Sequence, residues 1–508
     1  MSYKHKIKAL DDVASSLKPL AVEQKKVVHC HGVFDLLHIG HIRHLEQAKQ
    51  FGDLLIVTLT PDHHVNKGPN RPAFAQQLRA EAVAALDCVD YVAINKWPTA
   101  VETIRLLKPD VYVKGLEYKD SNNDITGKIK EETEAIRSVN GKIQFTEDIT
   151  FSSSRLINQL LPTFDDETNR YLEGFRKKFT QDEVLEYLRG LRKLKVGVIG
   201  ETIIDEYVYC NSLGKSGKES MLVMKYLSRE RYPGGVLALA NHMAGFCDSI
   251  TLLSYLGSEN TEKGFVKRNL KANIDPVFIE KSESPTIVKK RFLDSYSLSK
   301  LFGVYEINDE PLNSEEEKSL CKEIKKRLSD CDVVIIADYD HGLITPKVAD
   351  LLENTSSYLA INTQINAANI GFHAISKYNH ADYVCVQEGE LRLDRRSKRG
   401  DLEDLILDLA DRLDCPSIMV TRGSNGSLLY HQDSSFDYCP AFALNVVDRV
   451  GAGDAVLALT SLMAATGVPA AIINFVGNIV GANAVTIIGN KSAIDRTVLF
   501  KGITSLLK

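Results

Sequence analysis

An apolar strand runs into a helix through a glycine-bearing turn in the stretch Lys26-Val27-Val28-His29-Cys30-His31-Gly32-Val33-Phe34-Asp35-Leu36-Leu37-His38-Ile39-Gly40-His41. The helical pattern continues to about residue 51, and apolar strands follow at residues 54–59, 91–94 and 111–114, with helices between them. A helix near residues 154–161 closes this unit. Strands that alternate with helices indicate a parallel, doubly wound sheet. The sequence therefore predicts an α/β domain over residues 1–164.

A second unit with the same order of elements begins at residues 195–200, which form an apolar strand. Further buried strands are predicted at residues 333–337, 358–361, 383–386 and 417–421. The β-like stretch 207–232 is broken by Gly214, Lys215 and Gly217 and does not follow the strand–helix alternation, so it predicts a small β lid over a site. Charged helix formers fill residues 165–193, which are expected to be a helical linker. A second doubly wound α/β domain is expected over residues 194–508.

Length and composition exclude several classes of protein. A chain of 508 residues is too long to fold around a single hydrophobic core, so two or three domains are expected. A formal net charge of −5, from 62 basic and 67 acidic residues, argues against a nucleic-acid partner. Nine scattered cysteines without a CxxC pair indicate reduced thiols. We recognise no secretory signal and no apolar run as long as a membrane span, so we expect a cytoplasmic protein without a membrane partner.

His38, Gly40 and His41 stand where the first strand gives way to the first helix. A helix N-terminus has unpaired N–H groups and the positive end of the helix dipole, so it attracts phosphate. Two histidines three positions apart lie on one face and can reach the same anion. A metal site is the alternative, because five histidines fall between His29 and His44. Only Asp35 adds a carboxylate nearby, which makes the metal site the weaker interpretation.

The string from Gly32 to His41 resembles the GxFDxxHxGH motif of the cytidylyltransferase-like nucleotidyltransferases, with a Rossmann-like fold. Lys67-Gly68, Arg71-Pro72, Val113-Lys114-Gly115 and Ser152-Ser153-Ser154 follow in the family's order, and the resemblance covers about residues 25–162. It implies that a phosphate on the acceptor attacks the α-phosphate of a nucleoside triphosphate and expels pyrophosphate. It also implies roles for particular residues: phosphate contacts in the transition state for His38 and His41, neutralisation of phosphate charge for Lys67 and Lys114, and nucleotide binding for Gly32, Phe34, Asp35, Gly40, Arg71, Ser152, Ser153 and Ser154.

The segment Asp448-Arg449-Val450-Gly451-Ala452-Gly453-Asp454-Ala455 precedes a long apolar helix. Glycines at a helix start let successive backbone N–H groups surround an anion. A carboxylate held at the same point can take the proton of an attacking hydroxyl while those N–H groups hold the transferring phosphoryl group. Taken alone, the same residues also fit a glycine-rich turn with an aspartate at the helix start.

The wider context of this segment resembles the ribokinase (PfkB) family of carbohydrate kinases over about residues 194–500. The supporting strings are residues 200–205, the Pro233-Gly234-Gly235-Val236 turn and residues 421–426. The resemblance implies a ribokinase-like fold with Asp454 as general base and Gly451, Ala452 and Gly453 as an anion hole. It further implies sugar contacts from Asp205, Gly234, Gly235, Asn241 and Arg291, water-mediated binding of Mg²⁺ by Glu390, and nucleotide contacts from Thr421, Gly423 and Gly426.

Together the two domains resemble the bifunctional heptose-7-phosphate kinase / heptose-1-phosphate adenylyltransferases, in reversed order. The resemblance implies sugar phosphate and ATP as substrates with Mg²⁺ as cofactor, and leaves CTP open at the N-terminal site. Four positions depart from the kinase pattern: Ala238, His341, Asn362 and Gln387. They leave open a nucleotidyltransferase for another sugar or polyol phosphate with a divergent or inactive kinase-like domain. A nucleotide-sensing protein without turnover is less consistent with the retained His38, His41 and Asp454. The stretch 207–232 is expected to pair with its copy in a homodimer or higher oligomer.

Overall fold

The computed structural model describes residues 3–22, 24–65, 71–115, 128–146, 164–355, 357–367 and 369–508. Two compact units divide the chain, one formed by Met1–Leu172 with Thr497–Lys508 and the other by Glu173–Arg496. The division falls inside α7 (Asp166–Lys178), which α8 (Gln181–Gly190) follows. α8 starts with a capping box, in which Thr180 accepts from the backbone of Glu183. The predicted linker is therefore helical, while the domain limits at residues 164 and 194 stay a prediction.

A parallel sheet forms the centre of the first unit. Among the residues that the structure describes, it has the strand order β3-β2-β1-β4-β5. The strands are β1 (Val27–Gly32), β2 (Leu54–Leu59), β3 (Tyr91–Ile94), β4 (Val111–Gly115) and β5 (Lys142–Thr146), with α1 (Leu10–Val22), α2 (Ile39–Lys49), α3 (Gln76–Ala84), α4 (Val101–Leu107) and α5 (Lys128–Ser138) around them. The strand order reverses between β1 and β4, and ligands of such sheets bind at that point, beyond the carboxyl ends of the strands. The fold thus places the end of β1 and the end of β4 at one candidate site.

The second unit is built on a larger sheet, with strand order β10-β9-β6-β13-β14-β15-β16-β17-β18 in the described residues. Its strands are β6 (Lys195–Gly200), β9 (Ser249–Glu259), β10 (Ile274–Pro285), β13 (Val333–Asp338), β14 (Tyr358–Thr363), β15 (Tyr383–Gln387), β16 (Ser417–Thr421), β17 (Ser427–His431) and β18 (Ser435–Cys439). Pairing is parallel from β10 to β16 and antiparallel for β17 and β18. Every residue of β13 is buried, as expected for a parallel strand covered on both faces.

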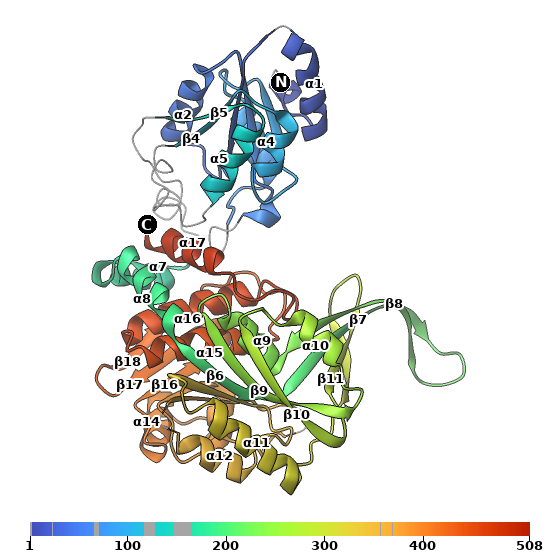
Figure 1. Cartoon of the computed structure of the whole chain (residues 1–508), viewed down its shortest axis with the longest axis vertical. Helices are drawn as coiled ribbons and strands as arrows, with labels where there is room; N and C mark the ends of the chain where they lie inside the picture. Colours follow the sequence, from blue (N-terminus) through green and yellow to red (C-terminus); the bar gives the residue numbers. More distant parts are fainter. Residues whose placement is uncertain are drawn as a thin grey trace. The chain divides into compact units, whose positions relative to one another are not determined.

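Helices cover both faces of this sheet (Figure 1). One face carries α9 (Gly235–Met243), α15 (Ala452–Ala465) and α16 (Ala470–Ala484), and the other α11 (Ser314–Arg327), α12 (Pro346–Glu353) and α14 (Leu402–Arg412). The shorter α10 (Lys263–Asn269) and α13 (Glu388–Asp394) complete the unit, and α17 (Arg496–Leu507) ends the described chain. α15 and α16 are apolar on nearly all sides and buried, which explains how a long apolar run forms part of a core. Within the described residues, every helix is too short or too polar to cross a bilayer.

A separate four-stranded sheet, formed entirely from described residues, makes the lid. Its strand order is β12-β11-β7-β8, with β7 (Thr202–Lys215), β8 (Leu222–Gly234), β11 (Ile287–Asp294) and β12 (Lys300–Glu306). The hairpin of β7 and β8 projects from the unit (Figure 1). The lid predicted at residues 207–232 is therefore present, but the sequence analysis missed its other half, because β11 pairs with β7 across a long chain separation and β12 joins the sheet at β11. We call this four-stranded sheet the lid.

Candidate functional site

In the first unit, the predicted histidines meet at the start of α2. His38 caps the helix, and its Nδ1 accepts a hydrogen bond from the backbone N–H of Gly40 at 3.1 Å. The ring of His41 stacks on that of His38, with centroids 3.9 Å apart, and Phe34 lies edge-on to His41 at 5.2 Å. A side chain at Gly32 would press on the ring of Phe34. The strand–turn–helix geometry therefore presents two imidazoles on one face, at the switch point of the sheet.

Asp35 and Arg71 lie beneath this turn, where they hold chain segments together. Asp35 is buried and accepts hydrogen bonds from the backbone N–H groups of Ala73 and Phe74, each at 3.1 Å. The Arg71 guanidinium lies 3.6 Å from the same carboxylate, and burial lowers the pKa of Arg71. These contacts orient the loop after residue 70 toward the histidine turn. The predicted residues Lys67, Ser152, Ser153 and Ser154 lie outside the described residues.

The other histidines of this cluster are neutral and bonded to threonine. His29 Nε2 and His31 Nδ1 lie 2.8 Å and 2.9 Å from Thr58 Oγ1. Burial, assisted by the charge of Lys114, lowers the pKa of His29 to about 3 and that of His44 to about 4. In the part of the chain that the structure describes, no group of three or more His, Cys, Asp or Glu side chains is placed to hold a metal ion.

Lys114 supplies the positive charge of the first site. It ends β4, next to β1 at the switch point, and its Nζ lies 2.9 Å from Glu132 Oε2 of α5. Both side chains are largely buried, and the ammonium also lies 5.3 Å from the centroid of the Tyr112 ring. A buried ion pair fixes the position of its cation. Lys114 is thus held beside the neutral histidines, as a phosphate-binding role requires.

In the second unit, the glycine segment forms an open helix start. Gly451 caps α15 with a φ of +82°, and a side chain there would collide with Asn490, so only glycine fits. Ala452 is the first residue of the helix. A Cβ on Gly453 would meet nothing within 4 Å, so space remains above the first turn. Backbone N–H groups that border open space at a helix start suit a phosphoryl group.

Asp454 lies in the first turn of α15 and is buried. Its Oδ1 accepts a hydrogen bond from the Tyr339 hydroxyl at 2.8 Å. Burial raises the pKa of Asp454 to about 7, and the bond from Tyr339 offsets part of that rise. Asp205, Lys289 and Glu390 are close enough to act on the same pKa. A carboxyl with this pKa can accept a proton near neutral pH, which is what a general base requires.

The predicted sugar-binding residues gather around Asp205 of β7. Arg291 of β11 forms an ion pair with its carboxylate. A side chain at Gly234 would collide with the same carboxylate, and Gly235 has a φ of +51° with its Cβ position 2.7 Å from the Glu201 carbonyl. The glycine pair therefore lets the turn between β8 and α9 pack directly on Asp205.

Asn241 has a different environment from the other predicted sugar contacts. Its Nδ2 donates to the carbonyl of Asn269 at 2.8 Å, and its Oδ1 accepts from the backbone N–H of Lys271 at 3.1 Å. These bonds join α9 to the segment after α10. The contact of Asn241 with sugar stays a prediction. The two hydrogen bonds show that its side chain holds these segments together.

Glu390 belongs to a capping box at the start of α13. Its Oε2 accepts from the backbone N–H of Gln387 at 2.8 Å and its Oε1 from that of Ile365 at 3.0 Å. Burial raises the pKa of Glu390. Both oxygens are occupied by backbone donors, so the carboxylate fits a hydrated Mg²⁺ held through water better than a directly coordinated ion.

The predicted nucleotide-binding segment follows β16. Thr421 ends that strand, and Gly423 borders open space, since a Cβ there would meet nothing within 4 Å. Gly426 has a φ of +77°, and a side chain there would collide with the Cys439 carbonyl. Gly426 therefore allows the tight backbone turn, and Gly423 leaves the surface of that turn uncovered. An uncovered turn of this kind is consistent with ligand binding.

Sequence reasoning missed several groups of the second site. Glu201 is fully buried, and its Oε1 accepts from the backbone N–H groups of His341 at 3.1 Å and Leu343 at 3.3 Å. Burial, and then the charge of Asp338, raises the pKa of Glu201 to about 7. Tyr339 and Lys289 were missed too. Glu201 and Tyr339 each follow directly on a buried strand, β6 and β13, and a polar residue at that place was the available signal.

Asp448 joins the lid to the glycine segment. Its carboxylate accepts from the Tyr207 hydroxyl at 2.6 Å and from Lys300 Nζ at 2.5 Å, two residues of the lid. It also accepts from the backbone N–H groups of Val450 at 3.1 Å and Gly489 at 2.9 Å. One carboxylate therefore links strands β7 and β12 to the turn that begins α15.

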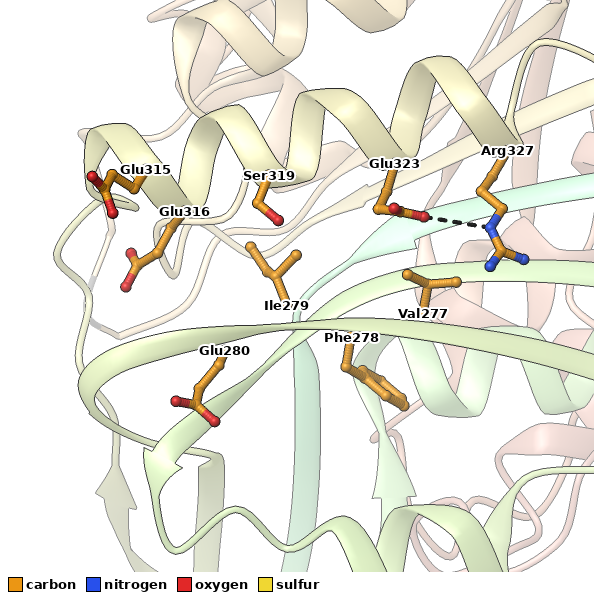
Figure 2. A pocket seen from close by; sticks show the side chains of 9 residues that line it. All are labelled: Val277, Phe278, Ile279, Glu280, Glu315, Glu316, Ser319, Glu323 and Arg327. Atoms are coloured by element: carbon orange, nitrogen blue, oxygen red, sulfur yellow. Dashed lines mark hydrogen bonds and ion pairs between the residues drawn. The ribbon is translucent and has the colours of Figure 1, made fainter.

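A cavity of about 550 Å³ lies elsewhere in the second unit, between β10 and α11 (Figure 2). Its lining comprises Val277, Phe278, Ile279, Glu280, Glu315, Glu316, Ser319, Glu323 and Arg327. Figure 2 shows four carboxylates along it, with Glu323 bonded to Arg327 at 3.4 Å. The carboxylate of Glu316 already accepts hydrogen bonds from the backbone N–H groups of Ser282 and Asn313. An acidic lining of this kind does not favour a triphosphate.

Two family patterns match the chain. The pattern of the pfkB family carbohydrate kinases matches residues 193–495, more than half of the chain. The chain belongs to the pfkB family. The cytidylyltransferase-like pattern matches residues 29–160. The pfkB kinase domain is therefore preceded by a nucleotidyltransferase-like domain, and the resemblance of both domains predicted from their motifs is confirmed.

Curated relatives resemble the N-terminal part of this pfkB protein. The bifunctional protein HldE of Geobacter metallireducens is 36% identical over 168 residues, which make up 32% of this chain and 32% of the relative. The bifunctional protein HldE of Campylobacter jejuni is 44% identical over 122 residues, 24% of this chain and 26% of the relative. The chain thus matches about a third of the length of these relatives, or less.

Among solved structures, phosphofructokinase-2 from Escherichia coli in complex with potassium is similar to 61% of this pfkB chain. The similarity covers 99% of that enzyme with a TM-score of 0.50 and 14% sequence identity. A sequence identity of 14% supports similarity of the fold alone. The predicted fold class, two α/β domains of which the second is ribokinase-like with a β lid, is confirmed.

Proposed function

We propose that the chain is a bifunctional enzyme of nucleotide-activated sugar synthesis. Its kinase domain transfers the γ-phosphoryl group of ATP to a sugar or sugar phosphate. Its N-terminal domain transfers a nucleotidyl group to a sugar 1-phosphate and releases pyrophosphate. The observation that carries the kinase function is the buried carboxyl of Asp454, with a pKa raised by burial to about 7, beside the open helix start at Gly453.

In the kinase reaction, the acceptor hydroxyl gives its proton to the Asp454 carboxylate as its oxygen attacks the γ-phosphorus of ATP. The bond from that phosphorus to the β–γ bridging oxygen breaks, and ADP leaves. The N–H groups at the start of α15 hold the charge that spreads over the transferring phosphoryl oxygens. Mg²⁺, held by the nucleotide and by Glu390 through water, would neutralise phosphate charge. Asp205 positions the acceptor, and the lid excludes water.

In the nucleotidyl transfer, a phosphate oxygen of the sugar 1-phosphate attacks the α-phosphorus of the nucleoside triphosphate. The bond to the β-phosphate oxygen breaks and pyrophosphate leaves, without a covalent enzyme intermediate. Charge grows on the α-phosphate oxygens, where His38, His41 and Lys114 donate hydrogen bonds or positive charge. The stacking of His38 on His41 at the start of α2, and the place of Lys114 at the end of β4, the strand beside β1, support this assignment.

Heptose 7-phosphate is our proposed acceptor for the kinase, and ADP-heptose the proposed final product. The support is the resemblance of the two domains to the heptose-7-phosphate kinase / heptose-1-phosphate adenylyltransferases and the similarity of the N-terminal domain to HldE proteins. ATP is the proposed nucleotide at both sites, and CTP is the alternative at the N-terminal site.

Two variants test the division of labour. Asp454→Asn should abolish phosphorylation of the acceptor and spare pyrophosphate release, because it removes the base but keeps the shape of the site. His41→Ala should have the opposite effect. Phosphorylation is read by mass spectrometry of a sugar-phosphate panel with ATP and CTP, and pyrophosphate by a coupled assay. If the unaltered protein phosphorylates no acceptor but still releases pyrophosphate, the alternative of a divergent kinase domain replaces this proposal.

A homodimer through the lid is part of the proposal. β8 is an edge strand of the lid sheet, and an edge strand can pair with its own copy about a two-fold axis. Large apolar side chains are exposed on the lid and on its projecting hairpin: Leu213, Met221, Leu222, Tyr226, Phe302 and Val304. Sedimentation showing only a monomer would contradict the dimer.

A further inference from the structure

Two cations lie beside one carboxylate on one face of strands β7 and β11 of the lid. β11 pairs in parallel with β7, so that Lys289 is the register partner of Asp205 and Arg291 that of Tyr207. Register partners and residues two apart share a face of a sheet, which places Lys289, Arg291 and Asp205 together. Lys290 points to the opposite face, where it forms an ion pair with Glu306.

Arg291 is the cation that balances Asp205, since the two form an ion pair. Lys289 is 5% exposed, and in the described part of the chain no carboxylate or other hydrogen-bond acceptor lies within bonding distance of its ammonium. Its ammonium lies over the face of the Tyr305 ring, 5.6 Å from the ring centroid. A buried cation without a partner is expensive to hold, and burial lowers the pKa of Lys289 accordingly.

The surroundings of Lys289 indicate which part of a substrate would meet it. Lys289 is the register partner of Asp205 within the lid sheet, whereas Asp454 lies outside the lid, in the first turn of α15. Asp205 is the predicted sugar contact and Asp454 the base at the transferred phosphoryl group. Lys289 therefore lies on the acceptor side of the site rather than on the nucleotide side.

We propose that Lys289 binds a phosphate group already present on the acceptor, and that the kinase domain is therefore selective for phosphorylated sugars over their neutral counterparts. This inference rests on the proposed kinase function and adds the residue that reads the acceptor's phosphate. The phosphate ester supplies the anion that balances Lys289, while Arg291 remains with Asp205. Phosphate bound to a desolvated ammonium gains a charge-assisted hydrogen bond, so the preference over a neutral sugar is large.

The test compares Lys289→Met with Lys290→Met, a matched control on the same strand whose side chain faces away from the site. Each full-length variant is assayed with ATP and a panel of five- to seven-carbon sugars, each offered as the neutral sugar and as its terminal phosphate ester. Binding of the same compounds is measured by calorimetry without ATP. We expect Lys289→Met to lower kcat/KM for phosphorylated acceptors about 100-fold through KM, with neutral sugars within about threefold. Lys289→Arg should recover part of the selectivity, and Lys290→Met should leave it unchanged.

Thermal unfolding separates this role from a structural one. Because Lys289 lacks a partner in the free protein, Lys289→Met should raise the unfolding temperature, whereas loss of a structural lysine would lower it. Equal losses with neutral and phosphorylated acceptors, or equal use of both by the unaltered protein, would overturn the inference and leave the kinase function standing. Lys289-dependent binding of a sugar phosphate without any phosphorylation would support the inference and refute the kinase function. Absence of binding across the whole panel would overturn the inference.

Discussion

Replacing Tyr339 with phenylalanine should move the acid limb of the kinase pH profile upward. The Tyr339 hydroxyl donates to Asp454 at 2.8 Å and holds the pKa of Asp454 at about 7, below the value that burial alone would give. A hydrogen bond to a charged group is worth about 1.5–3 kcal/mol, and one pKa unit corresponds to about 1.4 kcal/mol, so the pKa should rise by about 1–2 units. At pH 7 the ionised fraction of Asp454 would fall from about a half to between about a tenth and a hundredth.

The measurement is kcat/KM for the acceptor over a pH range of roughly 5.5 to 10 with saturating ATP, because this quantity reports the base in the enzyme–ATP complex before the acceptor binds. Tyr339→Phe should be slow at pH 7 and approach the unaltered enzyme at the alkaline end. Tyr383→Phe is the control, since that buried hydroxyl contacts Met419 Sδ at 3.3 Å and, among the residues that the structure describes, bonds to no carboxylate. An acid limb that stays near pH 7, or a loss of activity that persists at every pH, would refute Asp454 as the titrating base.

Three further changes test the second site. Gly453→Ala should leave the fold intact but reduce phosphorylation at least about tenfold, because the added methyl group fills the open helix start. Gly451→Ala should instead destabilise the domain by about 2 kcal/mol in urea unfolding, because Gly451 has a positive φ. Lys300→Met, which releases one lid contact of Asp448, should lower kcat/KM for the acceptor about tenfold without affecting pyrophosphate release. Asp454→Asn tests stability. A carboxyl with a raised folded-state pKa contributes stability that is complete below about pH 4 and lost as pH rises through about 7. The stability of Asp454→Asn relative to the unaltered protein should therefore grow by on the order of 4 kcal/mol between those limits.

Local patterns were sufficient to predict most of the framework. The strands at residues 27–32 and 333–338 were predictable because apolar runs bounded by glycine or polar residues are local signals. The helix starts at His38 and Gly451 were predictable for the same reason, since the capping and glycine residues stand directly before the helical pattern.

Contacts between distant segments could not be predicted from the sequence. Asp205 and Arg291 are 86 positions apart, and Tyr207 and Asp448 are 241 positions apart. No local pattern tells which strand of the lid will lie beside which other, so β11 and its Lys289 were missed. The same limit explains Asp35, whose place in the motif indicated a nucleotide contact, while its carboxylate holds the backbone of residues 73 and 74.

The sharing of Asp448 between the lid and the start of α15 has a thermodynamic consequence. A carboxylate that bonds to two segments makes their positions interdependent, so a ligand that orders one segment would also favour the bound position of the other. Acceptor and ATP should therefore strengthen each other's binding, and linkage requires the factor to be the same in both directions. The order in which the two substrates arrive would then change the route to the ternary complex but not its stability.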